Sequence, residues 1–137
     1  MRLSVPPRIL VTDDDPDMVR AMKVALEAAR FEVLTAPNGP ECLRKLRASK
    51  LDLLILDVMM TTETEGFQVA YEIRQDPQLR DLPILMLTAI ERKTGMKFSP
   101  ASDEEYLPVD DFLSKPVDLD ELVRRVQALL TKKTVQA

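Results

Sequence analysis

Short apolar stretches alternate along the chain with stretches in which apolar residues recur every three or four positions. The apolar stretches predict five β-strands, at residues 8–12, 31–35, 51–56, 82–87 and 111–114. In the third of these, four consecutive aliphatic residues from Leu53 to Leu56 are uninterrupted by polar positions. This pattern is typical of a strand covered on both faces in a parallel sheet.

The amphipathic stretches predict four helices, at residues 16–29, from the turn at 37–39 to just before Lys50, at 66–74, and from Asp118 onward. Asp15 is a good N-cap and Pro16 a good first residue for the first helix. Asp118 with Glu121 three residues later resembles a capping box for the last helix, and residues 131–137 follow as a polar tail. The alternation of strands and helices predicts an α/β fold with helices on both faces of a parallel sheet.

Composition narrows the class of protein. With 137 residues, the chain fits one domain with a core at about residues 8–130, and it contains no apolar run long enough for a membrane span. Residues 1–7 are too short and too polar for a signal peptide. The single cysteine, Cys42, excludes an internal disulfide and favours a buried thiol in a cytoplasmic protein.

Charge and residue types exclude further classes. The net charge is −4 and the basic residues are scattered, so no nucleic-acid partner is expected. The chain contains no histidine, which excludes a histidine acid, base or ligand supplied by this chain.

Polar residues gather where the predicted strands end. Asp13 and Asp14 follow the first strand, Asp57 ends the third, Thr88 ends the fourth and Lys115 follows the fifth. In a parallel sheet all of them project over the same edge, where α/β proteins bind ligands. Each residue alone has a simple structural explanation, such as a turn cap for Asp57, but together they favour one site.

The charges of this set indicate a cation. Two carboxylates ~4 Å apart repel by ~4 kcal/mol at an effective dielectric of ~20, so Asp13, Asp14 and Asp57 need a counter-ion. Oxygen ligands without histidine or cysteine select a hard ion, and Mg²⁺ is the usual partner where carboxylates meet phosphate. A carboxylate beside Mg²⁺ and a lysine is well placed to accept a phosphoryl group, which predicts an aspartyl-phosphate.

The segments at residues 9–16, 53–60, 83–89 and 111–116 together resemble the receiver domains of two-component response regulators. The resemblance implies a flavodoxin-like, doubly wound sheet of five parallel strands in the order 2-1-3-4-5, and a cis bond before Pro116. It implies that Asp57 is the phosphoacceptor, that Asp14 binds Mg²⁺ directly, and that Asp13 holds the metal largely through water. The backbone carbonyl of Met59 would be a further ligand.

The same resemblance assigns the remaining positions. Thr88 would bond a phosphoryl oxygen, Lys115 would pair with it, and Phe112 matches the family's aromatic switch position. Met59 and Ile90 would tune the lifetime of the phosphoryl group, and because neither side chain can hydrogen-bond an attacking water, the lifetime is expected to be long.

Two segments depart from the family pattern. Residues 61–66 lack the usual proline and are one residue longer, and the spacing between Thr88 and Lys115 is longer than usual. Residues 90–108 contain Gly95, Pro100 and Pro108 without a sustained apolar stripe, so the fourth helix of the family is expected to be short, shifted or missing.

The function expected from the sequence is that of a stand-alone receiver. It would take a phosphoryl group from the phosphohistidine of a sensor histidine kinase or phosphotransfer protein, and signal by contact with a downstream protein through an altered surface at residues 90–108. It would catalyse only its own phosphorylation and dephosphorylation. An aspartate-nucleophile phosphatase is the enzymatic alternative, although Met59 stands where such an enzyme needs a second acid. The third alternative is an adaptor that no longer switches.

Overall fold

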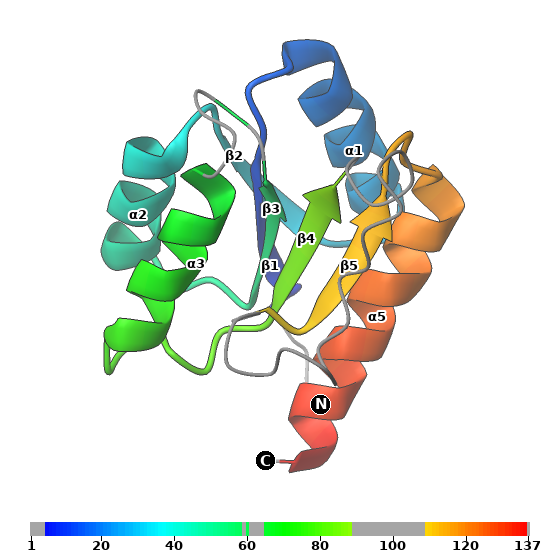
Figure 1. Cartoon of the computed structure of the whole chain (residues 1–137). Helices are drawn as coiled ribbons and strands as arrows, with labels where there is room; N and C mark the ends of the chain where they lie inside the picture. The colour runs from blue at the N-terminus through cyan, green and yellow to red at the C-terminus, as the bar shows by residue number, and fades with distance from the viewer. Residues whose placement is uncertain (1–4, 59, 61–64, 89–108, 137) are drawn as a thin grey trace.

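The computed structural model describes residues 5–58, 60, 65–88 and 109–136, with side chains to residue 131. Strands and helices alternate along these ranges (Figure 1). The strands are β1 (Arg8–Thr12), β2 (Glu32–Ala36), β3 (Leu53–Asp57), β4 (Ile84–Thr88) and β5 (Asp111–Ser114). The helices are α1 (Pro16–Ala28), α2 (Gly39–Ala48), α3 (Glu65–Gln75) and α5 (Leu119–Gln136).

All five strands pair in parallel, in the order β2-β1-β3-β4-β5, which confirms the predicted topology. β3 lies at the centre, and each of its five residues is buried, as its unbroken aliphatic run predicts. The outer strands β2 and β5 are only partly buried. The carboxyl ends of β1, β3, β4 and β5 therefore meet along one edge of the sheet.

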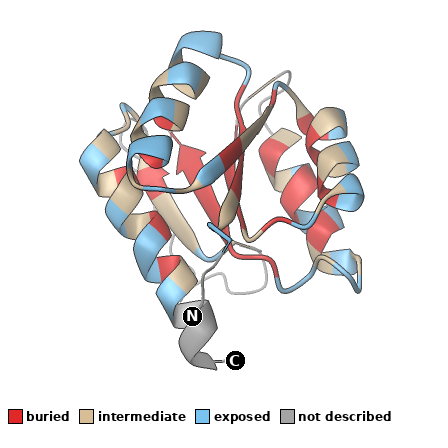
Figure 2. Ribbon diagram, turned by 180° about the vertical axis from the view of Figure 1, so that it is seen from behind, coloured by how far each residue is buried: buried red, intermediate tan, exposed pale blue. Residues whose placement is uncertain are grey.

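Helices cover both faces of the sheet, with α1 and α5 on one side and α2 and α3 on the other (Figure 1). Alternate strand residues face opposite ways: Ile9, Ile55 and Leu85 pack with α1 and α5, whereas Leu10, Leu54 and Met86 pack with α2 and α3. In Figure 2 the buried residues accordingly line the strands and the inner faces of the helices. No helix in the described ranges is long and apolar enough to cross a bilayer.

The predicted signals set the start of α1. The Asp15 side chain accepts hydrogen bonds from the backbone N–H groups of Asp17 and Met18, and Pro16 is the first helical residue. At the other end, Arg30 has φ 75°. Its N–H bonds to the carbonyl of Glu27, and that of Phe31 bonds to the carbonyl of Leu26. This is a Schellman ending with arginine at the position where glycine is most common.

Several boundaries differ from the predicted ones. β2 begins at Glu32, one residue late, because the N–H of Phe31 is used by the end of α1. α2 begins at Gly39, within the predicted turn, because the Asn38 side chain accepts the N–H of Glu41 and caps the helix. The boundaries of β3 and β4 differ by one or two residues from those predicted for the third and fourth strands. The expected fourth helix falls at residues 90–108, which lie outside the described part of the chain.

The C-terminal segment corrects two expectations. Asp118 accepts the N–H groups of Asp120 and Glu121, but the Glu121 side chain binds Arg124 and Arg125, so only half of the capping box forms. The predicted polar tail at 131–137 continues α5 as helix to Gln136. The Lys115–Pro116 bond is cis, as expected.

Candidate functional site

Three carboxylates meet at the carboxyl edge of the sheet. Asp13 and Asp14 follow β1, Asp57 ends the neighbouring strand β3, and one oxygen from each lies within 4.8 Å of the other two. Asp13 and Asp57 are each only 2% exposed, whereas Asp14 is exposed to solvent. The arrangement confirms the predicted convergence and leaves the cluster open on the side of Asp14.

Lys115 places a positive charge against the two buried carboxylates. Its Nζ lies 3.2 Å from Asp57 Oδ2 and 3.6 Å from Asp13 Oδ2. Its backbone N–H donates to the carbonyl of Thr88, which ties the residue after β5 to the end of β4. Lys115 therefore reaches the centre of the sheet edge from an outer strand.

The pKa values of both Asp57 and Lys115 are raised, but for different reasons. Burial, followed by the charge of Asp13, raises the pKa of Asp57 to about 6, although the ammonium of Lys115 acts in the other direction. For Lys115, burial alone would lower the pKa, but the charges of Asp57 and Asp13 outweigh it and the pKa is raised. The ammonium of Lys115 thus offsets only part of the effect that burial and the charge of Asp13 have on Asp57.

The residues fit a divalent cation. Asp13 Oδ1 accepts the N–H of Asp15, but Asp13 Oδ2 is buried and accepts no hydrogen bond from any described residue. Its ion pair with the Lys115 ammonium, at 3.6 Å, is longer than a hydrogen bond and is shared with Asp57, so a second cation would stabilise this buried oxygen. The donor set is made of oxygen atoms, which hard ions such as Mg²⁺ prefer. Asp13, Asp14 and Asp57 are therefore suited to hold Mg²⁺.

The other predicted residues lie at the same edge or outside the described ranges. Thr88 ends β4, is 3% exposed, and follows Leu87, which pairs in register with Asp57. Phe112, on β5, is half-buried and packs against the core on the side of α2 and α3. Met59 and Ile90 fall outside the described residues, so the expected carbonyl ligand and the two lifetime positions stay predictions.

The sequence does not predict a close contact between Gly66 and the backbone of Asp57. A Cβ added to Gly66, at the start of α3, would overlap the backbone carbonyl oxygen of Asp57 and lie 2.5 Å from Val58 Cα. The N–H of Gly66 donates to the carbonyl of Val58. The neighbouring Glu65 accepts the N–H of Gly39 at the start of α2. The sequence gives no sign of this contact, because spacing along the chain cannot reveal a close approach between backbones.

A cavity of about 470 Å³ lies beside the carboxylates. It is lined by Asp13 and Asp14, by residues of α1 that include Arg20 and Lys23, and by the end of β2. The cavity therefore adjoins Asp14, the exposed member of the cluster.

Known proteins resemble this chain over most of its length. The family model of the response regulator receiver domain matches residues 9–127. The alkaline phosphatase synthesis transcriptional regulatory protein PhoP of Bacillus subtilis is 34% identical over 137 residues, which cover 95% of this chain and 51% of PhoP. The chain spans about half the length of the first curated relatives it matches.

Solved structures agree with the observed topology. A putative response regulator from Chloroflexus aurantiacus superimposes with a TM-score of 0.79 at 32% identity, over 93% of this chain and 99% of that one. The response regulator TrrA of Thermotoga maritima, solved in complex with Mg²⁺-BeF, gives a TM-score of 0.73 at 35% identity, over 90% of this chain and 98% of TrrA.

Proposed function

This chain belongs to the receiver domains of two-component response regulators, and from that premise we propose that Asp57 is the residue that accepts the phosphoryl group. One observation supports this assignment above the others: Asp57 makes the shorter contact with the Lys115 ammonium, at 3.2 Å, and one of its oxygens lies within 4.8 Å of the acidic pair at the open edge of the sheet. Asp13 lies farther from this ammonium, at 3.6 Å, and among the described residues no ion pair joins the ammonium to Asp14, so Asp57 is the best placed of the three carboxylates.

In the proposed reaction, an oxygen of Asp57 bonds to phosphorus while the P–N bond of a donor phosphohistidine breaks and the imidazole leaves with the electron pair. Lys115 would pair with the incoming phosphoryl oxygens, and the Thr88 hydroxyl would donate to one of them. Asp13, Asp14 and Asp57 would hold Mg²⁺, which when bound neutralises charge on the transferring group. The resemblance to TrrA in its Mg²⁺-BeF complex supports the choice of ion.

The proposal extends to domain boundaries and partners. Residues 8–130 would form one receiver domain, whose donor is a histidine kinase or a phosphotransfer protein and whose output is contact with another protein in the cytoplasm. PhoP is named as a transcriptional regulator, but this chain matches only half of it. We therefore assign no nucleic-acid contact to the residues described here.

The test is mass spectrometry after exposure to acetyl phosphate with Mg²⁺. We expect a mass increase of one phosphoryl group in the peptide that contains Asp57, and no increase in Asp57→Ala. Asp52→Asn is the matched control, because Asp52 precedes the same strand at its opposite end, where it accepts the N–H of Arg8. Phosphorylation that persists in Asp57→Ala, or wild-type protein that stays unmodified, would contradict the assignment.

A further inference from the structure

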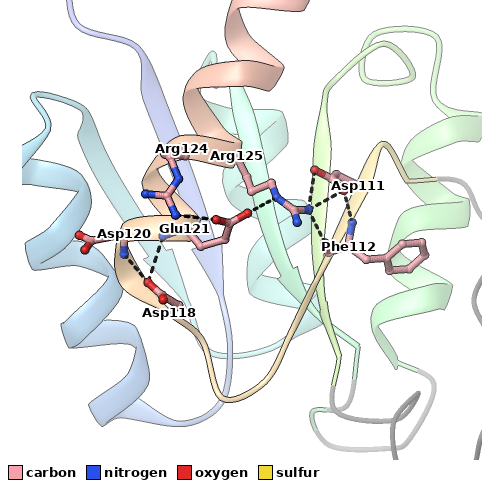
Figure 3. A network of polar contacts seen from close by, with 7 residues as sticks. All are labelled: Asp111, Phe112, Asp118, Asp120, Glu121, Arg124 and Arg125. Atoms are coloured by element: carbon pink, nitrogen blue, oxygen red, sulfur yellow. Dashed lines mark hydrogen bonds and ion pairs between the residues drawn. The ribbon is translucent and has the colours of Figure 1, made fainter.

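A polar network joins the outer strand β5 to helix α5 (Figure 3). Arg125 Nη1 lies 2.9 and 3.0 Å from the two carboxylate oxygens of Asp111 and 2.9 Å from the carbonyl oxygen of Phe112. Its Nε donates to Glu121 at 2.7 Å. The backbone N–H of Phe112 in turn donates to Asp111 Oδ1 at 2.8 Å. Side chains of this network therefore bind both backbone polar groups of Phe112.

The position of β5 gives this network its importance. β5 has four residues, and among the described strands it pairs with β4 alone. An edge strand presents one row of backbone polar groups without a strand partner, and those of Phe112 are covered by Asp111 and Arg125. Arg125 thus reaches from α5 around the edge of the sheet to hold the main chain of a residue whose ring extends away on the other side (Figure 3).

Lys115 follows Phe112 by three residues, and its ammonium must cross to Asp57 at the centre of the sheet. The backbone bond from Lys115 to Thr88 fixes where that side chain begins. Movement of β5 relative to β4 would disturb this bond and so shift the ammonium relative to Asp57. A planar guanidinium that binds a carboxylate and a carbonyl at once is well suited to restrict this movement, because its N–H donors are held in a fixed planar arrangement.

We propose that Arg125 is a positioning residue for phosphoryl transfer, which sets the place of Lys115 by holding the backbone of Phe112 together with Asp111. The proposal rests on the proposed function, because it concerns the efficiency of transfer to Asp57. Arg125 touches neither Asp57 nor the phosphoryl group and acts through β5 alone.

The chain offers a matched control at the preceding position. Arg124 lies on the same helix, carries the same charge and donates to the same Glu121 at 2.7 Å, but within the described part of the chain it binds nothing on β5. Arg125→Ala and Arg124→Ala therefore remove equal charge and one partner of Glu121 each. Only the first removes the contact with Phe112.

The first readout is the rate of phosphorylation by acetyl phosphate at saturating Mg²⁺. We expect Arg125→Ala to lower the rate about tenfold, because misplacement of a charged group near the reacting atoms is costly, and Arg124→Ala to leave it unchanged. Arg125→Lys should behave like the alanine variant, since an ammonium lacks the fork. Equal losses in Arg124→Ala and Arg125→Ala would indicate a charge effect and overturn the proposal.

The second readout is amide hydrogen exchange measured by NMR without phosphodonor. The Phe112 amide reports the network and the Lys115 amide reports the junction with Thr88. Both should exchange about tenfold faster in Arg125→Ala and at the wild-type rate in Arg124→Ala. If the alanine variant does not fold, Asp111→Asn serves instead, because asparagine can still accept the N–H of Phe112 but loses the ion pair.

The outcomes separate the two proposals. Wild-type protein that is not phosphorylated contradicts the proposed function, while the exchange data still decide whether Arg125 holds Lys115 in place. Wild-type protein that is phosphorylated, with an unchanged rate or an unchanged Lys115 amide in Arg125→Ala, leaves the function intact and refutes the positioning role.

Discussion

At the scale of single residues, the site is a balance of charges in which three carboxylates face one ammonium. Asp13 Oδ2 accepts no hydrogen bond from a described residue and shares the Lys115 ammonium with Asp57, and burial followed by the charge of Asp13 raises the pKa of Asp57. Burial of like charges destabilises the folded chain until a cation joins them. The residues that suit the site to phosphoryl transfer thus reduce the stability of the protein that carries them.

The first prediction concerns Mg²⁺. Because the proposed Mg²⁺ site exists only in the folded chain, Mg²⁺ at about 100 times its Kd should raise the free energy of unfolding by about 2.7 kcal/mol. Thermal melts of the wild type with and without Mg²⁺ measure the rise, and Asp14→Ala should abolish it. Asp17→Ala is the control, since Asp17 is an exposed acid of the first turn of α1 that pairs with Arg20. An undiminished rise in Asp14→Ala would remove Asp14 from the metal site.

The second prediction concerns Gly66. Because Gly66 has no side chain, the start of α3 packs directly on the backbone of Asp57 and Val58. These backbone atoms cannot move aside as the end of a side chain could. Gly66→Ala should lower the free energy of unfolding by about 2 kcal/mol or more and slow phosphorylation, as measured by denaturant titration and by mass spectrometry.

Gly39 provides the comparison for this variant. A Cβ there would lie 2.7 Å from Glu65 Oε2, the end of a flexible side chain, and 2.8 Å from Val69 Cγ2, so its nearest neighbours are side-chain atoms and not backbone. Gly39→Ala should therefore cost clearly less stability. Equal losses in the two variants would mean that contact with the Asp57 backbone is not what requires glycine at position 66.

At the scale of elements, the sequence predicts best where one physical effect dominates. The aliphatic run of Leu53–Leu56 predicts a buried strand, and Asp15 with Pro16 predicts the start of a helix. The structure contains both. The convergence of Asp13, Asp57 and Lys115 follows from parallel topology, which alternation alone predicts.

Other boundaries depend on contacts between elements that no local pattern contains. The start of β2 is set by the N–H of Phe31 at the end of α1, and the contact of Gly66 with Asp57 joins different elements. Arg125 is hidden for the same reason, because its partner Asp111 lies fourteen residues earlier on a strand. Its spacing from Glu121 indicates only an ordinary ion pair on a helix.

The third prediction concerns the end of α1. Arg30 adopts φ 75°, a backbone conformation that is strained for every residue with a Cβ. Arg30→Gly should relieve this strain and raise the free energy of unfolding by about 0.5–1 kcal/mol, as measured by urea titration. Arg20→Gly is the control, because Arg20 lies within the helix, where glycine should destabilise by a similar amount. A loss of stability in Arg30→Gly would contradict the left-handed assignment.

At the scale of the whole molecule, two cores on opposite faces of one sheet tie every described element together. Cys42 lies in the core on the side of α2 and α3 and is fully buried, as its position in the sequence predicts. Burial raises the pKa of its thiol to about 11. The thiol is therefore a probe of the opening of the entire domain.

The fourth prediction uses this probe. Because the pKa of Cys42 is raised by burial, the thiol stays protonated at pH 8 and only about one molecule in a thousand carries the reactive thiolate. Iodoacetamide should label the native protein far more slowly than the protein in urea, as followed by mass spectrometry. Mg²⁺ should slow labelling further in the wild type but not in Asp14→Ala. Rapid labelling of the native protein would show that the core on this side opens locally.

The pairing of Lys115 with Asp57 also orders events during synthesis. The ribosome makes the chain from its N-terminus, so Asp57 leaves the tunnel 58 residues before Lys115. At about 5–20 residues per second, the two are separated by roughly 3–12 s, during which the acidic cluster lacks its ammonium. A nascent chain cannot complete the site in this interval, because the ammonium that pairs with Asp57 has not yet been made.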